Sequence, residues 1–327
     1  MNIDELEQVE KEIKNIEKEL EATSVNAYKP DNSNSNSSSG LSVNRVEQKN
    51  FADDLEKKTI EFVAKVKPIL AILTPCYGGM CNSQYTLCLI DTIKLLENYG
   101  IVVKIFFLNN DSLVSRARNN LVGTAMLDKN ITHFMFIDSD IIWNPIDIIK
   151  LLVSDKQFIG GIYPKKTYKF DKIYSNPSVV TKWIEVKNSI SPDVSDEVIV
   201  KNNLVDYNLN YLSTNLQIVG NVVELKHIAT GFMMLKREVF DLMIMAYPET
   251  KYIDDTGFVE PKNSTFTYAL FDTGVLDKHY LSEDWMFCER WRKINGSVYA
   301  DISIDLTHIG TECYQGSLIK NLLTTKM

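Results

Sequence analysis

The stretch FMFIDSDIIWNP, residues 134–145, decides the fold because a buried strand, an acidic turn and a helix start follow one another within it. The apolar run FMFI predicts a buried strand, and Asn144 and Pro145 supply an N-cap and a first helical residue. Between them, Asp138 and Asp140 stand one residue apart. Burying carboxylates is costly, and two close together repel each other unless positive charge lies between them. The sequence therefore predicts a cation at the end of this strand.

Strands and helices alternate on both sides of this stretch. Short apolar runs predict strands, and longer segments with helical spacing of apolar residues predict helices. Such repetition implies an α/β fold with a parallel, doubly wound sheet and right-handed crossovers. The expected strands are 68–75, 101–108, 132–137 and 157–164, and the expected helices are 83–100, which Gly100 closes, 113–129 and 145–154.

The regular alternation stops after about residue 165. Residues 170–226 predict β-rich excursions joined by polar loops. Regular structure then returns as a strand and helix in 228–245, a helix in 282–296 and two short strands in 297–310.

The N-terminal segment differs in composition from the rest. Residues 1–22 are acidic with apolar residues at heptad spacing, which indicates either a short coiled-coil helix for homodimerisation or tethering, or a frayed acidic helix. The seam consists of Leu6, Val9, Ile13, Ile16 and Leu20. Residues 23–50, rich in Ser and Asn, predict a disordered linker. Residues 51–66 predict a helix that opens a single domain, 51–327.

Composition excludes several classes of protein. The 327 residues are 45% hydrophobic and 24% charged, which is typical of globular proteins. A net charge of -8 without a basic stripe argues against a nucleic-acid partner. No apolar run is long enough to span a bilayer, and the acidic N-terminus is unlike a signal peptide. Five cysteines without a CxxC pair suggest neither a disulfide framework nor a zinc ribbon, so we expect a cytoplasmic protein.

Ligands of open α/β sheets bind outside the carboxyl ends of the strands. That rule places residues 74–79, 109–118, 138–140 and 163–166 on one rim of the sheet. Asp138 and Asp140 offer hard oxygen ligands suited to Mg²⁺ or Mn²⁺, or else form a simple strand-end turn. His308, at the end of a strand, is either a structural hydrogen-bonding residue or a third ligand to such an ion.

Basic side chains on this rim have two readings. Arg116, Arg118 and Asn119 open a helix and either bind a phosphate or form a solvated charged face. The segment GGIYPKK either offers Tyr163, Lys165 or Lys166 to an anionic substrate or is a surface turn.

The acidic pair in LSEDWMFCERW is also ambiguous. Glu283 and Asp284 either favour the positive end of a helix dipole or provide a general base near a substrate hydroxyl. Trp285, on the same helix with Cys288 and Trp291, is expected in the core. Thr230 and Gly231 begin a buried strand, where glycine allows close approach of a ligand or marks a bulge.

Taken in order, the motifs TPCYGG, ARN, FIDSD, TGFMMLKR, EDWMFCERW and THIG resemble the GT-A class of glycosyltransferases, which use nucleotide-sugar donors. The resemblance covers about residues 68–310. The Asn-rich linker and the short motifs also resemble those of glycosyltransferases of large DNA viruses. It implies a nucleotide-binding half at about 68–165 and an acceptor-binding half at about 166–310. It also implies a UDP-sugar donor, a glycan or protein acceptor, and Mn²⁺ or Mg²⁺.

The resemblance assigns a role to each matching residue. Asp138, Asp140 and His308 would hold the metal, and Asp284, beside Glu283, would be the base of an inverting reaction. The donor site would contain Thr74, Pro75 and Tyr77 for the nucleoside, Arg116, Arg118, Asn119, Ser139 and Lys165 for the rest of the nucleotide, and Thr230 and Gly231 near the transferred sugar.

Three alternatives stay open. A haloacid dehalogenase-type phosphatase also places an aspartate pair after a strand, although there the pair typically follows the first strand of the domain. A non-catalytic sugar-nucleotide-binding module tethered by a coiled coil is the second. A nucleotidyltransferase, which would release pyrophosphate, is the third.

Overall fold

The computed structural model describes residues 42–46, 51–171, 201 and 204–311. The predicted coiled-coil helix and residues 23–41 of the predicted linker lie outside these residues, so dimerisation through 1–22 stays a prediction. Within the described part of the chain, no helix combines the length and the apolar character needed to cross a membrane.

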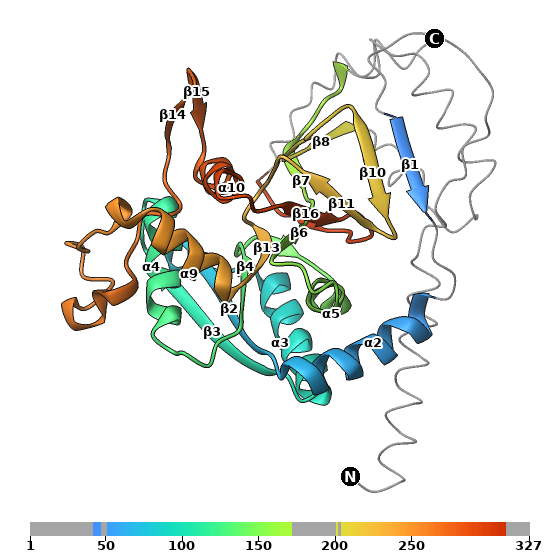
Figure 1. Cartoon of the computed structure of the whole chain (residues 1–327), viewed down its shortest axis with the longest axis horizontal. Coiled ribbons are helices and arrows are strands. Elements are labelled where there is room, and N and C mark those ends of the chain that lie inside the picture. The colour runs from blue at the N-terminus through green and yellow to red at the C-terminus, as the bar shows by residue number, and fades with distance from the viewer. Residues whose placement is uncertain (1–41, 47–50, 172–200, 202–203, 312–327) are drawn as a thin grey trace, which may run out of the picture.

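A nine-stranded mixed sheet forms the centre of the fold, in the order β1-β10-β11-β16-β6-β13-β4-β2-β3 (Figure 1). Two of the nine strands, β11 and β13, are antiparallel to both neighbours, so the other seven point the same way. The predicted α/β class with a mostly parallel sheet is therefore confirmed. The strands are β1 Ser42–Val46, β2 Ile69–Cys76, β3 Val102–Asn109, β4 His133–Ile137, β6 Phe158–Gly161, β10 Asn215–Val219, β11 Val222–Leu225, β13 Phe232–Lys236 and β16 Val298–Asp301.

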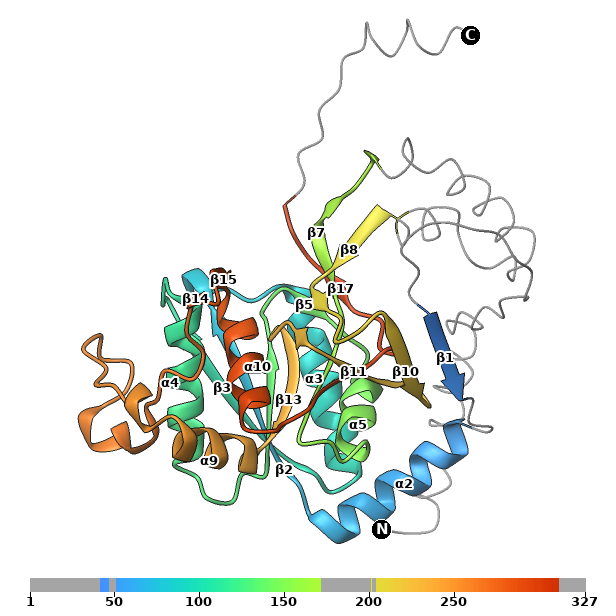
Figure 2. The same cartoon turned by 45° about the horizontal axis from the view of Figure 1, so that its top comes forward.

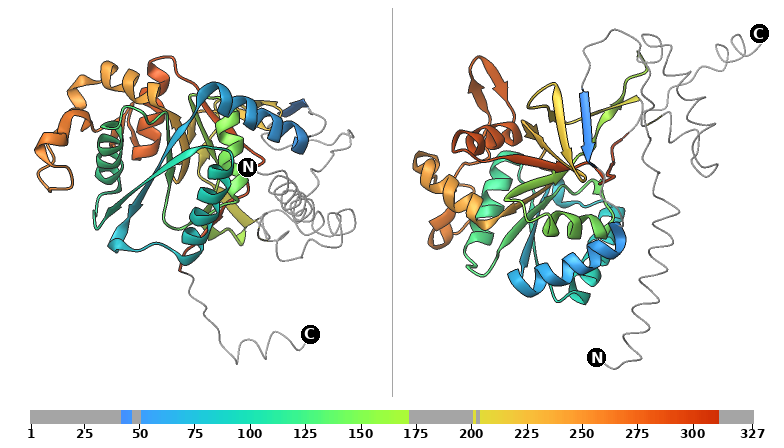
Figure 3. Two further views of the ribbon diagram at one scale, coloured as in Figure 1. Left: turned by 90° about the horizontal axis from the view of Figure 1, so that it is seen from below. Right: turned by 45° about the vertical axis from the view of Figure 1, so that its right-hand side comes forward.

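Helices cover both faces of the sheet, giving three layers (Figures 2 and 3). On one face lie α2 Phe51–Val66, α3 Ser83–Asn98 and α5 Pro145–Val153, and on the other α4 Val114–Met126, α9 Arg237–Ala246 and α10 Glu283–Lys293. β4 shows why a continuous apolar strand is needed between them. Phe134 and Phe136 pack into one core, Met135 and Ile137 into the other, and all four are fully buried.

In addition to the central sheet, the described chain forms several short two-stranded sheets. The pair β5 Ile141–Ile142 and β17 Thr307–His308 matters most, because its register sets His308 opposite Ile141 and so beside the acidic turn. The other pairs are β7 Pro164–Tyr168 with β8 Val205–Tyr207, β9 Leu209–Asn210 with β12 His227–Ile228, and β14 Gly274–Leu276 with β15 His279–Leu281.

Local signals placed most element boundaries correctly. The helix after the acidic turn has Asn144 as its N-cap, Asp147 completing a capping box and Pro145 in its first turn. One expected strand, 157–164, is wrong in its second half, because β6 ends at Gly161 and β7 begins a different sheet at Pro164. Proline has no N–H with which to continue a central ladder, and Pro164 instead begins β7, where it pairs with Tyr207 of β8.

The predicted linker, residues 23–50, requires a correction. Residues 42–46 form β1, which pairs in parallel with β10 at the edge of the sheet. The segment SVNRV has just two valines, at its second and fifth positions, and so shows no strand-like alternation after the Ser- and Asn-rich run before it. Backbone pairing with β10 then decides its conformation, which no local composition reveals. The β-rich character expected for 170–226 is confirmed by β8 to β11; residues 172–200 and 202–203 lie outside the described part.

Candidate functional site

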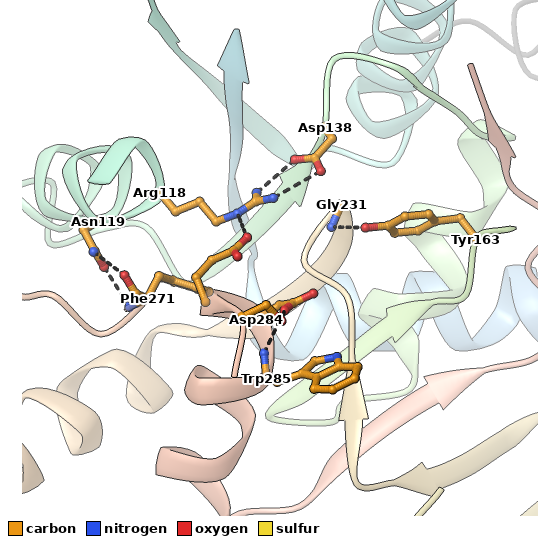
Figure 4. A network of polar contacts seen from close by, with 10 residues as sticks. Arg118, Asn119, Asp138, Tyr163, Gly231, Phe271, Asp284 and Trp285 are labelled. Atoms are coloured by element: carbon orange, nitrogen blue, oxygen red, sulfur yellow. Dashed lines mark hydrogen bonds and ion pairs between the residues drawn. The ribbon is translucent and has the colours of Figure 1, made fainter. Parts of the chain in front are cut away.

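The candidate site is built around the acidic turn after β4 (Figure 4). Three backbone hydrogen bonds fix this turn. The amide of Asp138 donates to the carbonyl of Gly231 at 3.0 Å, and the amide of Ile309 donates to that of Asp140 at 2.8 Å. The amide of Asn82, before α3, donates to Ser139 at 3.0 Å. Segments far apart in sequence therefore meet at this turn.

Arg118, on α4, neutralises the first aspartate. Its guanidinium donates to both carboxylate oxygens of Asp138, at 2.9 and 3.1 Å, and through Nε to Glu283 at 3.3 Å. The Arg118 side chain is only 4% exposed and lies 5.6 Å from the ring centre of Phe136. Burial opposes the charge, but pairing with Asp138 and Glu283 overrides it and raises the pKa of Arg118.

Lys166 and His308 lie beside the second aspartate, Asp140. Lys166, on β7, pairs with Oδ2 of Asp140, and Nε2 of His308 lies 3.6 Å from Oδ1. Nδ1 of His308 lies 2.9 Å from the Pro164 carbonyl and donates to it, and Nε2 is the ring nitrogen that faces Asp140. Although burial alone would raise it, hydrogen bonds from His308 and Lys166 lower the pKa of Asp140 to about 2.

This arrangement fits a hard cation at one of the two aspartates. Asp140 and His308 offer an oxygen and a correctly oriented nitrogen, with the imidazole held by a carbonyl as metal-binding histidines usually are. Asp138 instead has both oxygens occupied by Arg118. Among the described residues, no group of three His, Cys, Asp or Glu is assembled for a metal ion. The three-ligand set Asp138, Asp140 and His308 therefore stays a prediction, with Asp140 and His308 its better-placed members.

Asp284, in the first turn of α10, is the most deeply buried acid of the site, at 6% exposure. Its Oδ1 accepts hydrogen bonds from the Ser282 hydroxyl and from the Trp285 amide at 2.9 Å, and within the described part of the chain no hydrogen bond to Oδ2 is found. Burial and the neighbouring charge of Glu283 raise the pKa of Asp284. A carboxylate with a raised pKa and a free oxygen is suited to accept a proton.

Two buried polar atoms have no hydrogen-bond partner among the described residues: Oγ1 of Thr230, which precedes Gly231 in the sequence, and Nε1 of Trp285, which follows Asp284. Leaving such atoms unpaired is costly, which points to hydrogen bonds with a ligand. The Trp285 indole stacks on His227 at 5.2 Å, and His227 bonds Glu289 at 2.9 Å, so the ring is held in place. The sequence predicted Trp285 in the core. Its position directly after the acidic pair Glu283–Asp284 is the signal that could have identified it as a residue of the candidate site.

Gly231 is required by close packing. A Cβ there would lie 2.6 Å from the Tyr163 hydroxyl and 2.8 Å from Oδ2 of Asp138. The amide of Gly231 also donates to the Tyr163 hydroxyl at 3.1 Å. Glycine thus lets β13 approach the acidic turn, and Tyr163 joins the site through its hydroxyl.

The other polar residues of α4 are engaged elsewhere. The Asn119 amide exchanges two hydrogen bonds with the backbone of Phe271, at 2.7 and 2.9 Å, which ties α4 to the chain before α10. Arg116 donates to both oxygens of Asp111, at 2.9 and 2.7 Å. Of the three residues expected to bind phosphate, the structure brings Arg118 to the acidic turn.

The residues expected at the nucleoside lie on the same rim but differ in exposure. Thr74 is buried and hydrogen-bonded to the Tyr85 hydroxyl, and Pro75 is half-buried in β2. Tyr77 is 77% exposed and free to contact a ligand. Lys165 is exposed, and its neighbour Lys166 is the lysine that reaches the acidic turn.

Neither family models nor curated protein sequences gave a match to this chain. Solved structures gave distant resemblances. A197 from STIV is 16% identical with a TM-score of 0.39, covering 74% of this chain and 86% of its own. The inositol-1-phosphate CTP transferase from T. maritima is 8% identical (TM-score 0.36; 79% and 95% covered). UDP-glucose pyrophosphorylase complexed with UDP-glucose is 12% identical (TM-score 0.28; 76% and 78%). At these scores the function must be argued from the site itself.

Proposed function

We propose that this protein is a metal-dependent glycosyltransferase that moves a sugar from a nucleoside diphosphate sugar, preferably a UDP-sugar, to a hydroxyl of a glycan or protein acceptor. The observation that carries the proposal is an excess of negative charge at the rim. Four carboxylates meet there, those of Asp138, Asp140, Glu283 and Asp284. Two cationic side chains pair with three of them: Arg118 with Asp138 and Glu283, and Lys166 with Asp140.

An anionic donor would be repelled by this excess of carboxylates. A divalent cation would remove the repulsion, and Asp140 with His308 would hold it. When bound, such an ion neutralises the charge that develops on the departing diphosphate. Arg118 keeps Asp138 and Glu283 in position, and Lys166 supplies further positive charge beside Asp140.

Asp284 is the proposed base. It would accept the proton of the acceptor hydroxyl as the acceptor oxygen bonds to the anomeric carbon and the bond to the diphosphate breaks. Direct displacement of this kind inverts the anomeric configuration. Burial and the charge of Glu283 raise the pKa of Asp284, which strengthens it as a proton acceptor.

Thr230 and Trp285 suit the sugar itself. A sugar hydroxyl both accepts and donates hydrogen bonds, so it can satisfy the Trp285 N–H and the Thr230 hydroxyl, which find no protein partner in the described chain. The acids beside them disfavour a second anionic group at this position. A neutral, hydroxyl-rich ligand is therefore the better fit.

The test combines binding with transfer. Purified protein is incubated with nucleotide sugars, an acceptor library and Mn²⁺, and the released nucleotide product is identified. We expect Asp284→Asn to reduce transfer by about 10²–10⁴-fold while retaining the metal-dependent rise in melting temperature given by the nucleotide. Asp277→Asn, at the exposed tip of the β14–β15 hairpin, is the matched control.

The outcomes separate the proposal from its rivals. Unchanged transfer by Asp284→Asn would exclude this residue as the base. Release of pyrophosphate in a parallel incubation with a nucleoside triphosphate and a sugar phosphate would indicate a nucleotidyltransferase. Nucleotide binding with no transfer to any acceptor would indicate a non-catalytic binding module.

A further inference from the structure

Two cysteines face each other at the rim of the sheet. Cys76 ends β2, Cys81 precedes α3, and their Sγ atoms lie 3.2 Å apart. We propose that Cys76 and Cys81 form a reversible disulfide, which makes the 76–81 loop a site of modification by low-molecular-weight disulfides such as oxidised glutathione. The S–S bond of a disulfide measures about 2.05 Å, so bond formation requires the sulfurs to move closer by only about an ångström.

The approach of the two sulfurs is built into the loop. Gly78 and Gly79 both have positive φ, at 65° and 67°, which turns the chain back on itself. The loop is also anchored at both ends. The Cys76 carbonyl accepts a hydrogen bond from Asn110 at 3.1 Å, and Asn82 donates to Ser139 at 3.0 Å. The thiols are therefore held together by the fold and do not depend on a chance encounter.

The two thiols have unequal roles in the exchange reaction. Cys81 is exposed and Cys76 is buried, so Cys81 is the thiol that oxidised glutathione can reach. Burial raises the pKa of Cys76 to about 12, which keeps it protonated until a partner arrives. The Cys81 thiolate attacks oxidised glutathione, forming a mixed disulfide and releasing one glutathione thiolate. Cys76 then gives its proton to the released glutathione thiolate and attacks the sulfur of Cys81, and the second glutathione leaves as a thiolate that takes a proton from water.

Two protein thiols are thus oxidised while one glutathione disulfide is reduced to two glutathione molecules, which balances the electrons. Excess glutathione reverses both steps. The thiols at Cys88 and Cys288 lack this arrangement, because among the described residues neither contacts a second sulfur; Cys288 bonds the Ile228 carbonyl instead.

A consequence for the candidate site follows if the proposed function holds. Tyr77, expected beside the nucleoside, lies inside the loop that the bridge would close, and Asn82 connects the loop to the acidic turn. Closing the loop limits the positions that Tyr77 can adopt. We therefore expect oxidation to change nucleotide affinity.

The experiment uses the full chain with Cys88→Ser, so that the tryptic peptide between Lys65 and Lys94 carries just the two cysteines of interest. The protein is equilibrated over a range of reduced-to-oxidised glutathione ratios and quenched with a thiol-alkylating reagent. We expect peptide mapping to show an internal bridge that reduced glutathione reverses. Adding Cys76→Ser should instead trap the mixed disulfide on Cys81, and adding Cys81→Ser should abolish both products.

Two results would overturn the assignment: both thiols alkylated across the whole range, or a mixed disulfide on Cys81 that Cys76 never resolves. A separate arm measures the melting-temperature shift with UDP and Mn²⁺ for the reduced and bridged forms. A bridge without a difference in this shift would refute the coupling to the site but not the disulfide. Absence of any shift would count against the proposed function alone.

Discussion

Replacing Arg118 with Met should strongly destabilise the fold. The guanidinium makes three contacts, at 2.9, 3.1 and 3.3 Å, to two carboxylates that are 25% and 14% exposed. Methionine fills much of the same space but leaves Asp138 and Glu283 uncompensated. Removing one partner of a buried ion pair costs roughly 3–5 kcal/mol. At about 2–4 °C per kcal/mol for a domain of this size, the melting temperature should fall by roughly 6–20 °C.

Urea denaturation followed by circular dichroism measures the loss. Adding Asp138→Asn to Arg118→Met removes one of the stranded charges, so the double variant should recover at least about 1 kcal/mol relative to the sum of the single losses. Lys58→Met is the control, because its pair with Asp54 is exposed and should contribute less than about 1 kcal/mol. If Arg118→Met behaves like this control, or if the two site substitutions are additive, the guanidinium does not compensate these carboxylates and the reasoning fails.

Three other substitutions test separate features. Gly231→Ala should lower the free energy of unfolding by about 1–3 kcal/mol, because its Cβ would lie 2.6 Å from the Tyr163 hydroxyl; no loss in urea denaturation would show that the strand can shift. Burial lowers the pKa of His133 from 6.5 to about 4, so the unfolded chain binds more protons in this window and stability falls as the pH drops through it. His133→Phe should flatten that slope in denaturation series at several pH values, and exposed His279→Phe should retain it. Trp285→Phe replaces the indole by a smaller aromatic ring without an N–H, so kcat/KM for transfer should fall by about tenfold; unchanged kinetics would exclude the hydrogen bond.

The central units of the fold could be predicted because their signals are local. Alternate residues of β4 fill two cores, so its apolar run had to be continuous, and Asn144 with Pro145 fixed the next helix. The neighbours of each strand could not be predicted in the same way. β13 lies between β4 and β6 and is antiparallel to both. Its apolar run predicts a buried strand but does not indicate the direction of that strand in the sheet. The strand at 42–46 likewise exists through its pairing with β10.

The sequence indicated which residues belong to the candidate site better than it indicated which contacts they make. Position at the ends of strands identified Arg118 and Asp138 as residues of one rim, and the family resemblance added Asp284. The partners of Arg118 are 20 and 165 residues away in sequence, and no local pattern encodes such pairings. Trp285 was assigned to the core because its spacing puts it on one helical face with Cys288 and Trp291, and that spacing carries no information about the hydrogen bonding of its N–H.

The charge on the two aspartates shows what sequence reasoning can and cannot supply. Repulsion between the two carboxylates predicted positive charge beside them. The structure contains that charge, but as a separate cationic side chain for each aspartate. Arg118 occupies both oxygens of Asp138, whereas Lys166 occupies one oxygen of Asp140 and leaves the other facing His308. A metal ion in this site would therefore join on the Asp140 side, with Asp138 acting through Arg118 to hold Glu283 in place. The sequence motif does not distinguish Asp138 from Asp140. Their surroundings do, because Arg118 binds the first and Lys166 with His308 lies beside the second.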